Sequence, residues 1–285
     1  MTETGTDLPL DTHLHTDLSP DSNVPIDVYC ALAVEQGIAE LAITDHVDFD
    51  PRDPAYDYRD FATRERTVRE AAERWAPKGV AVRFGAELTY NRRWEDDVRA
   101  HLARHRYDYT IGSVHDWPDS PYRGAGVAAW IRTSSLHDVL APYFEEVTAA
   151  ARSRLFDTIG HLDVVKRYLH PHVPASALAG APELFEESLR ALVESGTALE
   201  VNTSGLRHDA GETYPAPWVV SWYHELGGER VTVGSDAHRK NHFAHGLDDG
   251  YRVVAEAGID RLAFRRGGEG VAVALPSRFR SGAAA

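Results

Sequence analysis

Short runs of hydrophobic residues alternate with longer amphipathic segments along the whole chain. The runs are rich in β-branched and aromatic residues, which is typical of buried strands. In the segments between them, apolar residues recur every three or four positions, as they do on one face of a helix. The sequence therefore predicts seven strands, at residues 8–13, 40–45, 80–88, 107–114, 155–162, 198–204 and 230–236.

Two of the amphipathic segments have clear helix boundaries. Residues 25–38 and 182–196 each begin with a proline and have a glycine where the pattern ends, as the first turn and the C-cap of a helix often do. Strands that alternate with helices predict a mostly parallel sheet with right-handed crossovers. Because seven such units follow one another without a visible linker, we expect a single α/β domain over residues 1–285, folded as one closed barrel.

The C-terminal part of the chain departs from this alternation. Residues 260–275, with the sequence DRLAFRRGGEGVAVAL, predict two short strands around a Gly-Gly turn. We expect this hairpin to be an addition to the barrel, with the core of the domain at about residues 9–275. Residues 276–285, which end in RSGAAA, are expected to be disordered.

Composition narrows the possible partners and compartments. The 285 residues have a formal net charge of −14, which argues against a nucleic acid or an anionic membrane surface as partner. The N-terminal residues are polar and acidic, and no apolar run reaches about 18 residues, so we expect neither a signal peptide nor a membrane span. The one cysteine, Cys30, suits a reducing compartment, and we expect a cytoplasmic protein.

Residue types that bind metals stand at the C-terminal end of nearly every predicted strand. Each alone has an ordinary explanation as a cap, a turn residue or a surface histidine. In a parallel barrel, however, all these strand ends open on the same face. We therefore predict a metal site at the C-terminal ends of the strands. The residues at these ends are His13, His15, Asp45, His46, Glu87, His115, His161, Asp236 and His238.

Six short motifs, in this order along the chain, resemble those of the polymerase and histidinol phosphatase (PHP) superfamily. They are HLHTDLSPDS, ITDHVD, GAEL, IGSVH, GHLD and VGSDAH. The resemblance extends from about residue 9 to about residue 275. It implies a distorted (β/α)7 barrel that holds two or three divalent metal ions.

The same resemblance assigns ligands to three metals, with Glu87 as a bridge between two of them. The three sets are His13, His15, Glu87 and Asp236; Glu87, His115 and His161; and Asp21, His46 and His238. Many relatives have histidine at the position of Asp21, which leaves the metal preference of the third set open. Zinc, manganese and iron all accept such mixed nitrogen and oxygen ligands.

Charge counting supports a phosphate-ester substrate. Six neutral imidazoles and three carboxylates around three divalent ions leave a core of about +3, which a phosphate dianion and a bridging hydroxide would neutralise. A metal-bound hydroxide forms near neutral pH and can attack phosphorus in line with the leaving oxygen. The predicted partner is therefore a small phosphorylated molecule, and no protein nucleophile is needed.

Two further stretches resemble the histidinol-phosphatase branch of the superfamily. They are LEVNTSGLRHDAGETYP at residues 199–215 and GHLDVVKRY at residues 160–168. The resemblance implies hydrolysis of L-histidinol phosphate to L-histidinol and phosphate, a step of histidine biosynthesis. Arg207 would clamp the phosphate, because a guanidinium offers two parallel donors. Lys166 and Arg167 are further candidates for this contact, or form the solvated face of a helix.

Four other residues near these motifs have alternative roles. Asp163 is predicted either to support a ligand histidine or to give a proton to the leaving alcohol, or else it caps a helix. Asn202 either orients the loop or substrate or caps a helix. His208 is a candidate substrate contact beside Arg207. Trp117 either lines a pocket for the imidazole or packs in the core.

The sequence alone is also compatible with other functions. The same chemistry could act on nucleotides or other small phosphate esters, and a barrel of this kind could also be a non-catalytic metal-binding or regulatory protein. An amidohydrolase begins with a similar pair of histidines but usually takes its bridging ligand from strand four, whereas Glu87 follows strand three. For histidinol phosphate, at least one acidic residue of the loops is expected to pair with the ammonium. The candidates are Asp48, Asp50, Asp116, Asp119, Asp209 and Glu212.

Overall fold

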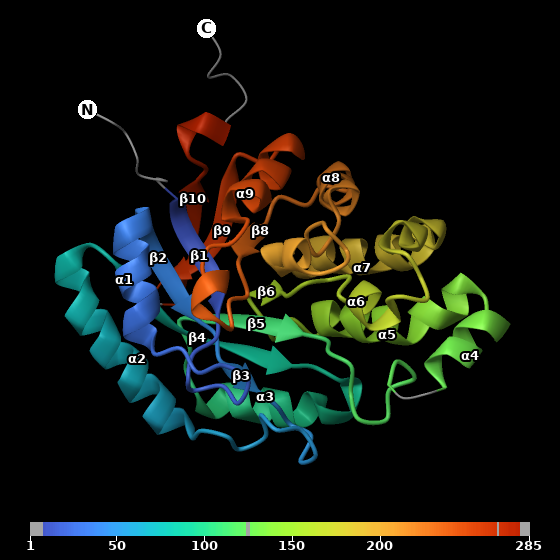
Figure 1. Cartoon of the computed structure of the whole chain (residues 1–285), viewed down its shortest axis with the longest axis horizontal. Coiled ribbons are helices and arrows are strands. Elements are labelled where there is room, and N and C mark those ends of the chain that lie inside the picture. The colour runs from blue at the N-terminus through green and yellow to red at the C-terminus, as the bar shows by residue number, and fades with distance from the viewer. Residues whose placement is uncertain (1–7, 124–125, 267, 280–285) are drawn as a thin grey trace, which may run out of the picture.

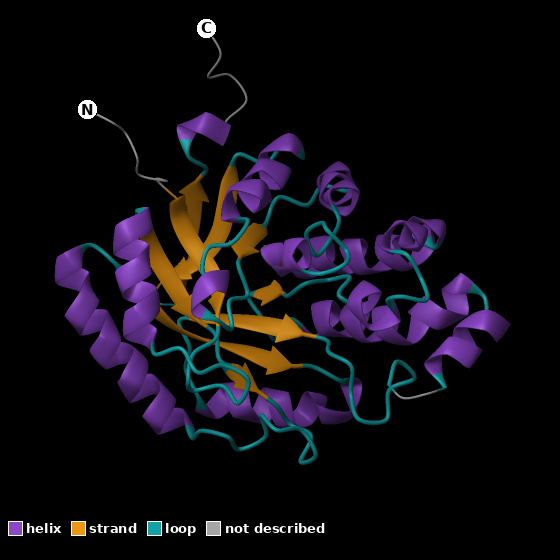
Figure 2. Cartoon of the chain, viewed as in Figure 1, coloured by secondary structure: helices purple, strands orange, loops and turns teal. Residues whose placement is uncertain are grey.

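A barrel of parallel strands forms the centre of the molecule, and helices surround it (Figures 1 and 2). The computed structural model describes residues 8–123, 126–266 and 268–279. Neighbouring strands of the barrel pair in parallel, and a bridge from Leu14 to Ala237 brings the first strand beside the end of the last. In sheet order the strands are β1 (Leu8–Leu14), β2 (Ile38–Ile43), β4 (Ala81–Thr89), β5 (Tyr109–Ser113), β6 (Thr158–Ile159), β7 (Ala198–Asn202) and β8 (Val231–Gly234).

Each predicted run overlaps one of these strands, so the barrel prediction is confirmed, but four of the runs form shorter strands than expected. The run at 155–162 forms only β6, because the chain turns at Gly160, where a Cβ atom would lie 2.5 Å from Ser113 Oγ. The run at 198–204 ends at Asn202, whose side chain accepts a hydrogen bond from Ser204 N and starts a 3-10 helix. An additional short strand that the sequence did not predict, β3 (His46–Val47), pairs with β4.

The helices cover the outside of the barrel. The two predicted helices are α1 (Ile26–Gln36) and α7 (Pro182–Ser195), and each ends before a glycine in the left-handed region, as expected. The others are α2 (Phe61–Trp75), α3 (Glu95–Arg104), α4 (Val127–Thr133), α5 (Leu136–Ser153), α6 (Val165–Leu169), α8 (Pro217–Glu225) and α9 (Leu247–Glu256). Short 3-10 helices are η1 (Ala76–Lys78), η2 (Arg92–Trp94), η3 (Ala175–Gly180), η4 (Thr203–Arg207), η5 (Lys240–His242) and η6 (Ser277–Phe279). Of the helices described, none is both long and apolar enough to cross a membrane.

The predicted C-terminal hairpin is present as β9 (Arg261–Arg266) and β10 (Glu269–Ala274), paired antiparallel. It packs at the end of the barrel where the strands begin, with the Phe264 ring 5.0 Å from the ring of Tyr109 on β5. Beyond the hairpin, part of the segment that was expected to be disordered is folded. Residues 277–279 form η6, and the Phe279 ring lies 5.9 Å from that of Tyr251, which anchors the turn. Residues 280–285 lie outside the described residues.

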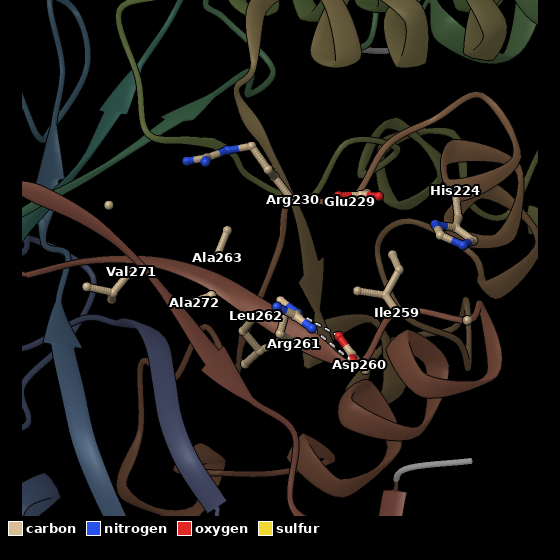
Figure 3. A pocket seen from close by; sticks show the side chains of 12 residues that line it. His224, Glu229, Arg230, Ile259, Asp260, Arg261, Leu262, Ala263, Val271 and Ala272 are labelled. Atoms are coloured by element: carbon tan, nitrogen blue, oxygen red, sulfur yellow. Dashed lines mark hydrogen bonds and ion pairs between the residues drawn. The ribbon is translucent and has the colours of Figure 1, made fainter. Parts of the chain in front are cut away.

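A recess of about 560 Å³ lies between this hairpin and the segment that leads into β8 (Figure 3). Its lining includes Glu229 and Arg230, just before β8. It also includes Arg261 and Asp260, which form an ion pair with 2.7 Å between Nε and Oδ1. It is therefore at the opposite end of the barrel from the predicted metal residues, and the described residues around it include none of the predicted site residues.

Candidate metal centre

His13, at the end of β1, and His15, just after this strand, begin the site. They are two positions apart on extended backbone, and both side chains are fully buried. Side chains two positions apart on a strand point to the same face. The Nε2 atoms of the two rings accordingly lie 3.0 Å apart.

Glu87, on β4, lies between two groups of histidines. Its Oε2 atom is 3.4 Å from the Nε2 atoms of both His13 and His15. Its Oε1 atom is 2.9 Å from His161 Nε2 and 3.3 Å from His115 Nε2. One carboxylate therefore faces two sets of nitrogen donors through its two oxygens, as a bridging ligand would.

His46 connects these groups to a more exposed part of the site. Its Nδ1 atom is 2.9 Å from Glu87 Oε2, and its Nε2 atom is 3.2 Å from Asp21 Oδ2. Asp21 Oδ2 is also 3.0 Å from His238 Nε2. The other nitrogen of His238 is 3.3 Å from Asp236 Oδ1, which is itself 3.4 Å from His15 Nε2. The structure thus brings all nine predicted ligands into one continuous cluster.

The donor atoms of this cluster fit divalent ions. The buried Glu87 Oε2 atom makes no hydrogen bond to the described residues, although histidine nitrogens face it at short distance. His161 Nδ1 is likewise buried without a partner in the described structure. The ligand atoms of His13, His15 and Glu87 lie within 4.8 Å of one another, as do those of His15, Asp21, His46 and His238. Imidazole and carboxylate groups are the ligands that zinc, manganese and iron accept.

The pKa values of the clustered side chains also indicate a metal site. Burial lowers the pKa of His15 well below its usual value, and the neighbouring rings of His238 and His46 add to the effect. Burial would also lower the pKa of His13, but the carboxylates around it hold that pKa well above its usual value. Without a metal ion, the buried carboxylates thus keep protons on part of the cluster. Cations bound at this position would replace those protons.

Two buried aspartates hold the loops carrying ligands: Asp11, which the sequence analysis did not single out, and Asp45, one of the strand-end residues named there. Asp11, on β1, accepts hydrogen bonds from Ser235 N at 2.8 Å and Ser235 Oγ at 2.6 Å, next to Asp236. Asp45 accepts from Thr16 N at 2.6 Å and Thr16 Oγ1 at 2.8 Å. Burial raises the pKa of Asp11 to about 6 and also raises that of Asp45. In the sequence, each of these aspartates lies within or beside an otherwise apolar strand, and this feature indicates a supporting role.

Three of the predicted substrate contacts form a group at the rim, beside Asp236. Arg207 donates from its two terminal nitrogens to the carbonyl oxygens of Ser235 at 2.8 Å and Asp236 at 2.9 Å. The pKa of His208 is lowered by burial and by the nearby charges of Arg167 and Arg207. Arg167 is exposed. The group therefore presents positive charge next to the cluster.

Lys166 differs from its neighbour Arg167, because its ammonium is buried. The Nζ atom donates to Asp163 Oδ2 at 3.0 Å, Glu212 Oε1 at 2.9 Å and the Thr213 carbonyl at 3.0 Å. An ammonium has three N–H groups, so these three oxygens use all its donors. The predicted contact between Lys166 and phosphate stays a prediction, and in this arrangement it would require one of these bonds to break.

Asp163 and Asn202 are both buried. Asp163 Oδ2 accepts from Lys166 and from Ala216 N, whereas its Oδ1 atom has no partner within the described part of the chain. Burial raises the pKa of Asp163. Asn202 caps η4 through its Oδ1 atom and donates from Nδ2 to two carboxylates, one of them that of Asp236 at 3.3 Å. Its capping role is therefore seen, and it also contacts a predicted ligand.

A small recess beside His115 joins the site to the surrounding loops. Asp48, Trp94 and Trp117 are among its lining residues. Trp117 also packs edge-on against Tyr122, with ring centroids 6.2 Å apart, so it both packs and lines the recess. With a volume of about 30 Å³, the recess has room for little more than a water molecule, so the predicted contact between Trp117 and the imidazole stays a prediction.

Most acidic residues of these loops already have cationic partners. Arg52 bonds Asp50 and Asp119, Arg123 bonds Asp116, Lys166 bonds Glu212, and His170 lies 3.2 Å from Asp209. Asp48 differs, since its side chain accepts a hydrogen bond from the backbone N of Asp50 at 2.8 Å. Among the described acidic candidates, Asp48 alone has no ion pair.

Comparison with known proteins places this geometry in a family. The sequence profile of the PHP domain matches residues 11–204. A protein of Deinococcus radiodurans named "Probable histidinol-phosphatase" is 31% identical over 260 residues, which are 90% of this chain and 96% of the relative. A protein of the same name from Thermotoga maritima is 29% identical over 89% of this chain and 94% of its own length.

A solved structure shows the same fold. It is that of a histidinol phosphate phosphatase from Lactococcus lactis subsp. lactis, in complex with zinc, L-histidinol and phosphate. It covers 92% of this chain and 98% of its own, with a TM-score of 0.79 and 22% sequence identity. The profile match and the identity over almost the full length agree with the motifs and the ligand cluster: this chain belongs to the PHP domain family.

Proposed function

We propose that this protein is a metal-dependent phosphomonoesterase that hydrolyses L-histidinol phosphate to L-histidinol and phosphate. The observation that carries the proposal is the position of Glu87 between two groups of imidazoles, with Arg207 at the rim. The names of the relatives, which match nearly the whole chain, support the choice of substrate.

Two or three divalent ions, of zinc, manganese or iron, would be held by the nine clustered side chains. His13, His15, Glu87 and Asp236 would hold one ion, Glu87 with His115 and His161 a second, and Asp21 with His46 and His238 a third. When bound, such ions activate water and stabilise the charge that develops at phosphorus. The zinc in the structure of the Lactococcus relative supports a divalent ion here.

The protein's own groups would bind and orient the ester. Arg207 uses one N–H of each terminal nitrogen on the carbonyls of Ser235 and Asp236, just after β8, so its remaining N–H groups can bind phosphate oxygens. Arg167 and His208 would add to this contact, since the charges of Arg167 and Arg207 both act on the His208 ring. Asp163 is the proposed proton donor to the leaving alcohol, with its unpartnered Oδ1 as the donating atom.

The expected partner is a small molecule in the cytoplasm. The net charge of −14 supports a small ligand held by a local cationic centre over a nucleic acid. A single buried cysteine and a biosynthetic reaction both support the cytoplasmic location.

The substrate assignment predicts a steep specificity profile. We expect kcat/KM for histidinol phosphate to exceed that for AMP or a hexose phosphate by at least about 100-fold, since one charge pair with the substrate ammonium can supply about 3 kcal/mol. Phosphate release with each ester, in the presence of zinc, manganese or iron, measures this ratio. A flat profile would instead indicate a general phosphoesterase on the same barrel.

Asp48 is the acidic residue best placed to supply that charge pair. We expect Asp48→Asn to raise KM for histidinol phosphate by about 10-fold, because a half-exposed charged hydrogen bond is worth roughly 1–2 kcal/mol. KM for phenyl phosphate, which has no ammonium, should not change. Asp119→Asn is the matched control, since Asp119 is paired with Arg52 and with Arg93, a residue that lines the same recess as Asp48. Equal effects of Asp48→Asn on both esters would contradict an ammonium contact.

A further inference from the structure

Strand β7 contributes none of the predicted metal ligands, yet it places a carboxylate inside the barrel. Glu200 and Asn202 lie two positions apart on this strand, and neither side chain is exposed to solvent at all. Alternate residues of a strand share a face, so both point toward the cluster. A buried carboxylate in the middle of an apolar strand is costly unless it is bonded, and the contacts of Glu200 show what bonds it.

Glu200 joins two ligand-bearing segments. Its Oε1 atom lies 2.6 Å from His13 Nδ1, and its Oε2 atom accepts a hydrogen bond from the backbone N of His161 at 2.8 Å. His13 is on β1 and His161 follows β6, so one carboxylate connects ligands assigned to two different ions. Two glycines make room for it. A Cβ atom at Gly234 would lie 2.9 Å from Glu200 Oε1, and one at Gly160 would lie 3.4 Å from Oε2.

Asn202 completes the arrangement. Its Nδ2 group donates to Glu200 Oε2 at 3.1 Å and lies 3.3 Å from Asp236 Oδ2. Its Oδ1 atom accepts from Ser204 N at 2.9 Å, which fixes the orientation of the amide. Asn202 thereby holds the Oε2 atom of Glu200 while Oε1 faces His13, and its Nδ2 atom lies 3.5 Å from His13 Nδ1. Asp236 is tied to the same strand.

We propose that Glu200, steadied by Asn202, is a positioning residue that sets the orientation of His13 and His161 for metal binding. A carboxylate beside Nδ1 keeps the proton on that nitrogen, so the lone pair of the imidazole is on Nε2. The Nε2 atom of His13 is the one that faces His15 and Glu87. The bond to His161 N fixes the strained turn after β6, where His161 has a φ of 21°.

This inference rests on the metal centre of the proposed function but not on its substrate. Because Glu200 bonds ligands of two ions, its loss should weaken binding at both. Removal of such a supporting carboxylate typically costs 10- to 100-fold in metal affinity. We therefore expect Glu200→Gln to lower the affinity for Zn²⁺ and Co²⁺ by about that factor.

Metal titration in the absence of any ester tests the proposal. Affinities of the purified full chain are measured by competition with a chelator, and the Co²⁺ absorption spectrum reports the ligand geometry. Glu40→Gln is the matched control, because Glu40 is an equally buried carboxylate, on β2, bonded to Arg83 and Arg266 at the other end of the barrel. We expect wild-type affinity and spectrum in the control and a weakened affinity with an altered spectrum in Glu200→Gln.

Two results would overturn the proposal: wild-type metal affinity in folded Glu200→Gln, or an equal loss of affinity in Glu40→Gln. If Glu200→Gln does not fold, Glu200→Asp decides in the same titration, since it keeps the charge but withdraws the carboxylate from His13 Nδ1 and His161 N. A reduced affinity in that variant supports the proposal, and an unchanged one overturns it. A protein that binds metals as expected but does not hydrolyse histidinol phosphate would contradict the proposed substrate alone.

Discussion

Replacement of Glu87 by glutamine is expected to remove most of the bound metal and to lower kcat by about 100- to 4000-fold. Both oxygens of the carboxylate face imidazole nitrogens, at 3.4 Å or less. An amide keeps one oxygen but has no negative charge to share between two ions. Loss of a buried charged partner costs about 3–5 kcal/mol, and each 1.4 kcal/mol corresponds to a factor of ten.

Elemental analysis after passage over a chelating resin, together with steady-state kinetics, measures both effects. Glu146→Gln is the control, because Glu146 is also buried but bonds Arg92 outside the cluster. It should retain its metal and its activity. If Glu87→Gln binds a full complement of ions, Glu87 is not a bridging ligand and the assignment of the first two sets is wrong.

The positions of the metal residues could be predicted because they depend on local pattern and on one general rule. Alternation along β1 places His13 and His15 on the same face, and the parallel order of the strands brings Glu87 and Asp236 to the same end. The lengths of the strands could be predicted less accurately. β6 ends at Ile159, just before Gly160, where a side chain would meet Ser113, a neighbour that is distant in sequence.

The supporting residues could not be assigned from sequence for the same physical reason. Glu200 acts through His13, which is 187 positions away, and Asp11 acts through Ser235, which is 224 positions away. A helix pattern also does not distinguish Lys166 from Arg167, although the ammonium of Lys166 is buried among three oxygens and Arg167 is exposed. Such roles depend on which side chains the tertiary fold brings together.

Arg207 has two possible roles in the structure, and they predict different results. It donates to the carbonyls of Ser235 and Asp236, so it could brace the turn that carries a ligand. That turn has other supports, however. Asp236 N donates to the His13 carbonyl at 2.8 Å, and Ser235 is held by Asp11. The turn should therefore keep its shape without Arg207, which favours the role of a phosphate clamp.

We accordingly expect Arg207→Ala to lower kcat/KM by roughly 30- to 1000-fold, mainly through KM, while the metal content stays at the wild-type level. The loss of a bidentate charged contact in a partly dry site corresponds to about 2–4 kcal/mol. Arg207→Lys should recover only part of this loss, because an ammonium keeps the charge but not the two parallel donors. A fall in metal content would show that Arg207 braces Asp236. Wild-type kinetics would instead indicate that Arg167, the other arginine of the rim, binds the phosphate.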